Sequence, residues 1–380
     1  MKGKTAFSEV KKNFGFGCMR LPMNGGEVDY AQTCRMADMF LAAGFNYFDT
    51  AHGYIEEKSE IAVRECLVKR YPREKFVLAN KLSGSYFDSN GQIRPLFEKQ
   101  LAACGVDYFD FYLMHAQTAA LFEKFRRCKA YETAFRLKEE GKVRHVGLSF
   151  HDRAEVLDEI LTEYSDIEFV QIQFNYADFD DACIQSGKCY DVCRKHGKPI
   201  IVMEPVKGGT LVNLPERAAR ILSKSTSQSS AAFAIRYAAS FDGIFMVLSG
   251  MSNTEQMKDN LSAMKDFEKM SAAEFETVSQ IRQILKERDI ISCTACRYCT
   301  DGCPKKISIP DLFSCMNAKK QFNDWNSAYY YGVFTKNGGK ASDCIACGKC
   351  ESACPQHLPI RGLLKSVAEQ FDCGEPETGD

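Results

Sequence analysis

Two short cysteine runs near the C-terminus constrain this 380-residue chain more than any other feature. The first run is Cys293, Cys296, Cys299 and Cys303, and the second is Cys344, Cys347, Cys350 and Cys354. Each run has the spacing C-x2-C-x2-C-x3-C and is followed directly by a proline. This spacing is typical of ligands to a [4Fe–4S] cluster, because three thiolates on one tight loop can each reach a different iron.

The fourth cysteine of each run lies too far along the chain to close the same cluster comfortably. In proteins with two such clusters, the fourth cysteine crosses to the other cluster. We therefore expect one cluster to be bound by Cys293, Cys296, Cys299 and Cys354. The second cluster is expected to be bound by Cys344, Cys347, Cys350 and Cys303. A chain with two [4Fe–4S] clusters would transfer electrons one at a time.

Zinc is the main alternative, because four cysteines can also bind Zn²⁺ tetrahedrally. Zinc sites usually separate two C-x2-C pairs by a longer stretch, so the spacing favours iron–sulfur clusters. A disulfide framework belongs to small secreted domains, and the N-terminal residues contain no apolar run of signal-peptide length. The 18 cysteines then indicate a reducing compartment, and we expect a cytoplasmic protein.

The bulk composition excludes two classes of partner. The formal net charge is −1, which gives no electrostatic reason to bind nucleic acid or an anionic membrane. No stretch approaches the roughly 20 apolar residues of a membrane-spanning helix. The length exceeds that of a usual single domain and predicts one large domain with a smaller one.

Residues 14 to about 250 alternate short apolar runs with amphipathic stretches. The expected strands are Phe14–Met19, Tyr47–Thr50, Phe76–Lys81, Phe109–His115, Val143–Phe150, Phe169–Tyr176, Pro199–Glu204 and Ile244–Ser249. Helices are expected between them, for example at Tyr30–Ala43, Lys58–Lys69, Leu121–Glu140 and Asp180–His196. Eight strands alternating with crossover helices predict an α/β fold, the (β/α)8 TIM barrel. A doubly wound sheet would need a GxGxxG turn after its first strand, and none is present.

We expect the barrel to occupy residues 1–290 and a small, mostly α-helical iron–sulfur domain to occupy residues 291–380. Residues 251–290 have the amphipathic pattern of one or two helices that complete the barrel. Between the cysteine runs, we expect helices at Ile309–Ala318 and Trp325–Phe334 that pack over the clusters and shield them.

Polar, titratable side chains end three consecutive expected strands. Asp49 and Tyr54 follow the second strand, Lys81 ends the third and His115 ends the fourth. Catalytic residues of a (β/α)8 barrel lie at these strand ends. The set suits carbonyl reduction, in which Tyr54 donates a proton and His115 orients the carbonyl oxygen. Lys81 would lower the pKa of Tyr54, and Asp49 would pair with Lys81. The neighbouring His52 is either a substrate ligand or a rim residue.

The chain from about 14 to 265 resembles the aldo-keto reductases, and Asp49, Tyr54, Lys81 and His115 match the tetrad of that family position by position. The segments GFGCMRLP, SEIAVRECL and GKVRHVGLSF resemble its first strand, second helix and fifth strand. The resemblance implies a nicotinamide cofactor and hydride transfer between it and a small carbonyl or alcohol substrate. By position, the implied cofactor-binding residues are Ser149, Gln171, Met203, Gly250, Gln256 and Asn260. The C-terminal part is similar to ferredoxin-type domains.

Several positions depart from the family pattern. Phe150 stands where asparagine is common, and Met203 stands where an aromatic ring usually stacks on the nicotinamide. Glu204 would repel a cofactor phosphate. Gly250 and Gln256 stand where lysine and arginine usually bind the 2′-phosphate, so we expect NADH to be favoured over NADPH. The chain has no flavin fingerprint, although a barrel mouth can bind flavin phosphate without one.

A hydride carries two electrons and a [4Fe–4S] cluster carries one, so the clusters need not take part in the reaction of the barrel. Three functions are consistent with these features. The first is a nicotinamide-dependent carbonyl reductase whose clusters exchange electrons with a ferredoxin-like partner. The second is the same reductase with clusters that only brace its C-terminal part. The third is an electron-transfer or adaptor protein whose barrel has lost nicotinamide chemistry. The intact tetrad favours an enzyme.

Overall fold

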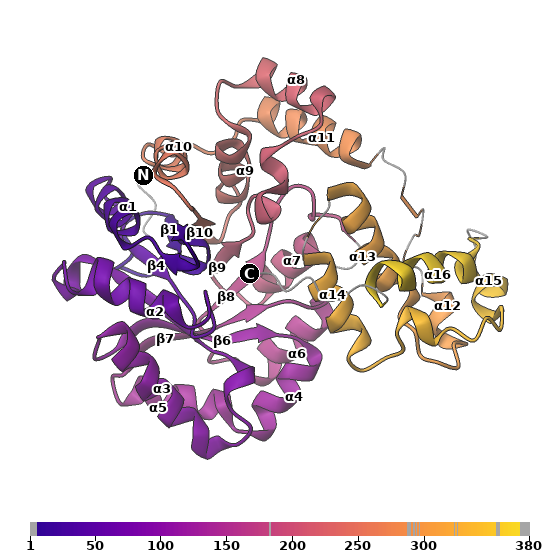
Figure 1. The fold of residues 1–380 in the computed structure, drawn as a ribbon, viewed down its shortest axis with the longest axis horizontal. Coiled ribbons are helices and arrows are strands. Elements are labelled where there is room, and N and C mark those ends of the chain that lie inside the picture. Colours follow the sequence, from indigo (N-terminus) through magenta and orange to yellow (C-terminus); the bar gives the residue numbers. More distant parts are fainter. Residues whose placement is uncertain are drawn as a thin grey trace.

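The computed structural model describes residues 6–181, 184–286, 290–291, 293, 295, 297–322, 324, 326–354 and 358–372. Its main body is a closed barrel of eight parallel strands (Figure 1). The strands are β1 (Phe14–Gly17), β4 (Tyr47–Asp49), β5 (Val77–Leu82), β6 (Phe109–Gln117), β7 (Val143–Phe150), β8 (Phe169–Gln173), β9 (Ile200–Met203) and β10 (Ile244–Gly250). Strands β4 to β10 pair in chain order, and β1 closes the barrel between β10 and β4. The predicted TIM barrel and its eight strands are confirmed. A small antiparallel hairpin, β2 (Met23–Asn24) and β3 (Glu27–Val28), precedes the first helix.

Helices surround the barrel (Figure 1). They are α1 (Tyr30–Ala42), α2 (Lys58–Val63), α3 (Asn90–Cys104), α4 (Ala119–Arg127), α5 (Ala130–Glu139), α6 (Ala154–Glu163), α7 (Ser186–Lys195), α8 (Glu216–Ser225), α9 (Ser230–Ala239), α10 (Thr254–Met264) and α11 (Ala272–Lys286). The single helix expected over 121–140 is two helices, because Lys129 adopts a left-handed conformation with φ 53°. The helix expected from residue 180 begins later, at Ser186, and residues 182–183 lie outside the described part.

Apolar side chains fill the barrel toward the amino ends of its strands. Phe111 and Phe169 point inward, and Phe7 packs edge-on against them with ring centroids 5.0 and 6.0 Å away. Gly147 faces Phe169, and a Cβ at Gly147 would lie only 2.5 Å from that ring. Side chains alternate along a strand, so the same inward rows reach Gln171 two positions after Phe169 and His115 four positions after Phe111. The space available for chemistry therefore lies at the carboxyl end of the barrel.

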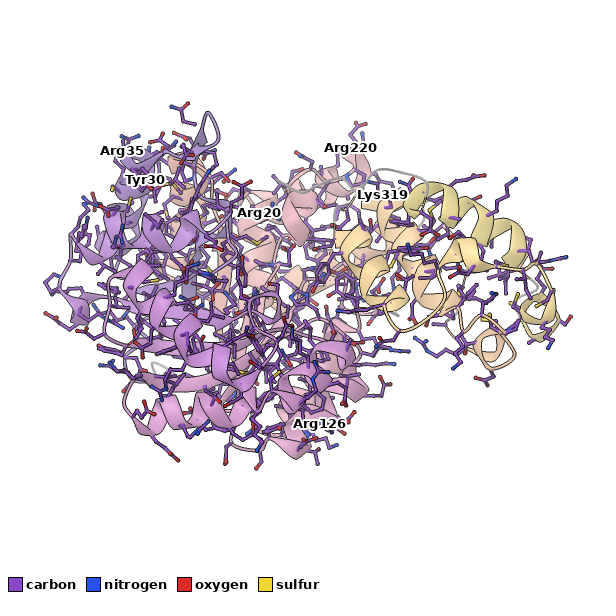
Figure 2. All side chains as sticks on the ribbon, turned by 60° about the horizontal axis from the view of Figure 1, so that its bottom comes forward. Arg20, Tyr30, Arg35, Arg126, Arg220 and Lys319 are labelled. Carbon is purple, nitrogen blue, oxygen red and sulfur yellow. The ribbon has the colours of Figure 1, made fainter. Side chains whose placement is uncertain are left out.

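The residues after α11 form a second, helical unit with its own apolar core. Its helices are α12 (Tyr298–Asp301), α13 (Ile309–Phe322), α14 (Asn326–Thr335), α15 (Lys349–Ala353) and α16 (Ile360–Phe371). The core contains Leu312, Phe313, Tyr331 and Ile360. This unit extends to one side of the barrel, with α15 at its far end (Figures 1 and 2). In the described ranges, no helix has both the length and the apolar character needed to cross a membrane.

Helix α14 joins the second unit to the barrel mouth. Tyr330 on α14 donates a hydrogen bond to Gln173 Oε1 at the end of β8, at 3.0 Å. The Tyr330 hydroxyl also lies 3.4 Å from Nδ1 of His151, which follows β7. The long segment between the cysteine runs predicts a helix here, and α14 confirms it. The structure shows this helix in contact with the barrel, and its shielding of the clusters stays a prediction.

A buried ion network connects the two units. Lys207 follows β9, and its side chain is 1% exposed. Its Nζ lies 2.7 Å from Asp178 Oδ1, in the loop after β8, and 3.1 Å from Asp324 Oδ2, between α13 and α14. Both carboxylates are buried as well. Because a buried charge is costly without a partner, Lys207 holds a carboxylate from each unit in place.

Replacing Lys207 with methionine keeps the length of the side chain but removes its charge. We expect the variant to lose about 3 to 5 kcal/mol of unfolding free energy, because Asp178 and Asp324 are left buried and unpaired. Anaerobic urea titration followed by circular dichroism measures this loss. Lys69→Met is the control, since Lys69 pairs with Glu65 on an exposed helix face, where such a pair contributes about 0.3 to 0.5 kcal/mol. Equal stability of the two variants would contradict the assigned role of Lys207.

Candidate active site

Asp49, Tyr54, Lys81 and His115 meet at the carboxyl end of the barrel. Lys81 Nζ donates to Asp49 Oδ1 at 2.6 Å and to the Tyr54 hydroxyl at 3.1 Å. It also donates to the backbone carbonyl of Thr50 at 2.8 Å. The rings of Tyr54 and His115 lie 6.0 Å apart at 73°. The four residues predicted at the ends of three strands therefore lie together in one site.

The backbone after β4 places Tyr54 above Lys81. Three consecutive residues, Ile55, Glu56 and Glu57, have φ angles of 51°, 53° and 68°. This left-handed region is uncommon for residues other than glycine, and such conformations cluster at functional sites. The turn leads into α2 and leaves the Tyr54 ring centroid 4.7 Å from Lys81 Nζ.

Burial controls the protonation of the groups around Lys81. Burial raises the pKa of Asp49, and the Lys81 charge opposes that rise. Burial by itself would lower the pKa of Lys81, but the Asp49 carboxylate and Tyr54 raise it above the ordinary value. Burial lowers the pKa of His115 well below its usual range, and the Lys81 charge lowers it further. His115 is therefore neutral near pH 7.

Two opposing effects set the pKa of Tyr54. The sequence predicts that Lys81 lowers this pKa, and the Lys81 charge does so in the structure. In the structure, burial raises the pKa of Tyr54, and this effect outweighs the lowering by Lys81. Tyr54 therefore carries its proton at neutral pH, and the ammonium group of Lys81 is placed to stabilise the phenolate once the proton has left.

The two histidines near the tetrad have different surroundings. Ser83 Oγ lies 2.6 Å from His115 Nδ1 and orients that ring. His52 is buried, and its Nδ1 lies 2.7 Å from Glu60 Oε2. His52 does not line the cavity described next, so its surroundings are those of a structural residue.

A cavity of about 310 Å³ lies at the barrel mouth and is large enough for a small ligand. It is bordered both by the barrel and by helix α14 of the second unit. Its lining includes Tyr54, His115, His151, Asn326 and Tyr329. The rings of His151 and Tyr329 pack edge-on, with centroids 5.6 Å apart. The residues around this cavity therefore come from two parts of the chain that are far apart in sequence.

Four of the six expected cofactor-binding residues line this cavity: Ser149, Gln171, Met203 and Gly250. Gln171 Nε2 donates to Met203 Sδ at 3.4 Å. Gln171 Oε1 is buried and has no hydrogen-bond partner among the described residues. Buried acceptors are normally satisfied, and the amide group of a nicotinamide would supply the missing donor. The residues at this end of the cavity thus fit the cofactor that the family resemblance implies.

The other two expected cofactor-binding residues are engaged elsewhere. Gln256 Oε1 accepts a hydrogen bond from the backbone nitrogen of Ser252 at 2.7 Å, at the start of α10. Asn260 is buried and donates to Ser249 Oγ at 2.9 Å. Lys258, the remaining cation considered for the cofactor phosphate, is exposed and does not border the cavity.

Arg20 is a cavity residue that sequence reasoning missed (labelled in Figure 2). It follows β1 and lies over Gly250, where an added Cβ would be 3.3 Å from Arg20 Cβ. Its Nη2 lies 3.9 Å from Oε1 of Glu204. Burial raises the pKa of Glu204, and Arg20 opposes the rise. No sequence pattern marks Arg20, because its place in the cavity depends on its packing over Gly250 in the folded barrel.

The described residues of the two cysteine runs have matching left-handed positions. Ala295 and Ala346 occupy equivalent positions, and each has a φ angle of 54°. Two residues later, Arg297 and Gly348 have φ angles of 67° and 76°. Left-handed residues that alternate in this way make a concave loop of backbone N–H groups, a form that binds anions and iron–sulfur clusters.

One cavity of the second unit is bordered by four cysteines, namely Cys303, Cys344, Cys347 and Cys350. This is the group that the spacing predicts for one cluster, with Cys303 contributed by the first run. Among the described residues, no three His, Cys, Asp or Glu side chains lie as close together as a single metal ion requires. Four thiols around one cavity match the number of ligands that a [4Fe–4S] cluster takes.

The cysteines expected on the other cluster are described only in part. Cys299 and Cys354 are both buried in the apolar core of the second unit, and Cys293 packs against that core. Cys296 lies outside the described residues. The complete ligand set of this cluster therefore stays a prediction.

Comparisons with known proteins match both parts of the chain. Residues 13–283 match the aldo/keto reductase family, and residues 292–358 match a 4Fe-4S dicluster domain. An NADH-specific methylglyoxal reductase of Escherichia coli is 29% identical over 210 residues, which cover 50% of this chain and 61% of that protein. The chain thus spans less than two thirds of that relative. A probable NAD(P)H-dependent D-xylose reductase of Aspergillus clavatus is 39% identical over 114 residues, covering 28% of this chain and 32% of that protein.

Solved structures show the same fold. The holo form of an aldo-keto reductase from Bacillus halodurans has a TM-score of 0.58 and 25% identity, covering 72% of this chain and 92% of that one. An aldo-keto reductase from Klebsiella pneumoniae in complex with NADPH has a TM-score of 0.58 and 18% identity, covering 72% and 95%. Because the family match spans most of the chain and coincides with the barrel, this protein belongs to the aldo/keto reductase family, with a 4Fe-4S dicluster, ferredoxin-type domain after the barrel.

Proposed function

We propose that this protein is an NAD(P)H-dependent carbonyl reductase whose two clusters exchange electrons with a separate one-electron carrier. The observation that carries the proposal is the tetrad, in which Lys81 bridges Asp49 and Tyr54 at 2.6 and 3.1 Å beside the cavity. The names of two relatives support a small carbonyl substrate, since methylglyoxal and D-xylose are both of this class.

In the proposed reaction, the nicotinamide supplies the hydride when it is bound. Tyr54 donates its proton to the carbonyl oxygen, so that the carbonyl carbon gains the hydride and the product is an alcohol. Lys81 lies close enough to the Tyr54 hydroxyl to stabilise the phenolate that remains. Asp49 keeps Lys81 charged, and the neutral His115 donates a hydrogen bond that orients the carbonyl oxygen.

We propose NADH as the preferred cofactor. The 2′-phosphate of NADPH is best bound by the two-pronged guanidinium of arginine. In the described structure, Gly250 ends β10 and Gln256 lies at the start of α10, and neither offers a charge. Arg20 faces Glu204 instead. A binding titration in which NADPH binds at least tenfold more tightly than NADH would contradict this preference.

The substrate is expected to lie between the tetrad and α14. The cavity beside Tyr54 is also lined by Asn326 and Tyr329 of α14 and by His151, which follows β7. Burial lowers the pKa of His151 to about 4, and Lys81 adds to the effect, so His151 is neutral at pH 7. These groups offer hydrogen bonds without charge, which suits a small polar carbonyl compound.

A coupled reaction needs a stage that converts two electrons into single electrons. A hydride carries two electrons and each cluster takes one, so a flavin or a comparable group would have to accept the pair and release it in two steps. The barrel mouth is a site where this fold can bind flavin phosphate. A flavin would be one such stage if the barrel and the clusters exchange electrons, although the chain has no flavin fingerprint.

Tyr54→Phe removes the proton donor and keeps the ring. We expect kcat for carbonyl reduction to fall about 10²- to 10⁴-fold, while NADH binding, measured by fluorescence titration, stays unchanged. Tyr30→Phe is the control, since Tyr30 lies on α1 and is exposed. Unchanged kcat in Tyr54→Phe on every carbonyl tested would support the alternative of an electron-transfer protein whose barrel has lost this chemistry.

Tyr329→Ala tests whether the second unit forms part of the substrate pocket. Loss of an aromatic wall should lower kcat/KM by about tenfold or more, mainly through KM, because the binding surface is lost and the proton donor is kept. Steady-state kinetics with a series of aldehydes of increasing size measures the effect. Tyr30→Ala serves as the control, and equal kinetics for the two variants would contradict a shared pocket.

Anaerobic titration tests the coupling between barrel and clusters. After reconstitution with iron and sulfide, NADH should bleach the cluster absorbance, and denaturation should then release a flavin. Cys347→Ser should weaken the bleaching and leave carbonyl reduction by Tyr54 intact. The opposite result is an unchanged cluster absorbance, with NADH consumed only when a carbonyl is present. The clusters would then stabilise the fold or accept electrons from a different donor.

A further inference from the structure

The two cysteine runs have different neighbours. In the first run, Ala295 and Arg297 lie against the barrel, because they border the same cavity as Phe179 and Gln185 of the barrel. The second run contains α15, which packs against α12 of the first run and lies farther from the barrel (Figure 1). The cavity bordered by Cys303, Cys344, Cys347 and Cys350 is lined entirely by residues of the second unit in the described part of the chain. A cluster held there would be the one more distant from the barrel.

The wall of this distant cavity is exposed and basic. Ile345 is 57% exposed, and Cys347 beside it is exposed as well. Among the described residues, the charged side chains of the lining are Lys305, Lys349 and Arg361, and no carboxylate belongs to it. Arg361 pairs with Glu351 at 2.8 Å, and Lys305 and Lys349 are exposed. We call Lys305, Ile345, Cys347, Lys349 and Arg361 the basic face.

We infer that the basic face is the docking surface for the one-electron carrier, and that this carrier is a small acidic redox protein. The inference rests on the proposed function, because it assumes that the distant cluster exchanges electrons. Opposite charges steer two proteins together and set their orientation. The exposed Ile345 lines the same cavity as the charged residues and offers an apolar contact. In the docked pair, the reduced carrier gives one electron to the oxidised cluster, and no bond or proton is exchanged.

Lysines near a cluster can also have a simpler role. A cluster with four thiolate ligands is an anion, and nearby cations offset its charge without any partner. This simpler role predicts that removing the lysines changes the midpoint potential of the cluster and slows every electron donor alike. A docking surface predicts a loss that is specific to an acidic protein donor and that disappears at high salt.

The test uses the full-length protein with its clusters and the double variant Lys305→Glu/Lys349→Glu. Anaerobic stopped-flow spectroscopy follows electron transfer from a reduced acidic ferredoxin to the clusters. We expect the second-order rate constant at low salt to fall at least tenfold, since steering of this kind changes association rates by about 10- to 10³-fold. The rate with photoreduced deazariboflavin, a small uncharged donor, should change less than twofold.

Lys224→Glu/Lys320→Glu is the matched control, because it changes the net charge equally and alters exposed lysines that do not line this cavity. Its rate with ferredoxin should stay within twofold of the wild-type rate. The proposal is overturned if the double variant of the basic face behaves like this control, or if it slows equally with ferredoxin and deazariboflavin.

Behaviour of the wild-type protein separates this inference from the proposed function. Wild-type clusters that accept electrons from deazariboflavin but not from ferredoxin would overturn the docking surface alone. Clusters that accept electrons from neither donor would overturn the electron exchange of the proposed function as well. Cluster absorbance recorded before each experiment confirms that every variant carries the same iron content.

Discussion

The cavity at the barrel mouth depends on the buried contact of Lys207 with Asp178 and Asp324. A lysine ammonium removed from water needs carboxylate partners nearby, because desolvation of an isolated charge costs several kcal/mol. Here one partner belongs to the barrel and the other to the helical unit. The full set of partners therefore exists only while the two units are docked. The same docking brings α14 over the barrel, so the cavity wall formed by Asn326 and Tyr329 depends on an ion network outside the cavity.

The parts of this structure that the sequence predicted are those governed by short-range periodicity. Eight apolar runs gave eight strands, because strand length and alternation are local properties. Lys81 and His115 could be placed at the barrel mouth because each ends such a run, and parallel strands present their carboxyl ends on one side. The grouping of Cys303 around the second cysteine run also followed from spacing alone, since a chain of so few residues limits which sulfurs can meet.

The parts that the sequence did not predict depend on packing between distant segments. Nothing in the sequence around Tyr330 indicates that its hydroxyl reaches Gln173, because no local pattern encodes a contact over such a separation. Arg20 came into the cavity through the space above Gly250, which only the folded barrel reveals. The net pKa of Tyr54 could not be predicted, because the opposing effects of burial and of the Lys81 charge can be weighed only once the depth of burial is known.

Helix α14 belongs at once to the apolar core of the cluster-binding unit and to the wall of the barrel cavity. Any ligand that touches both Tyr329 and the tetrad binds the docked arrangement more tightly than a separated one. Thermodynamic reciprocity then requires that docking and ligand affinity strengthen each other by the same factor. Affinity for the substrate and docking of the two units are therefore thermodynamically coupled. A substitution on α14 that changes one of them also changes the other.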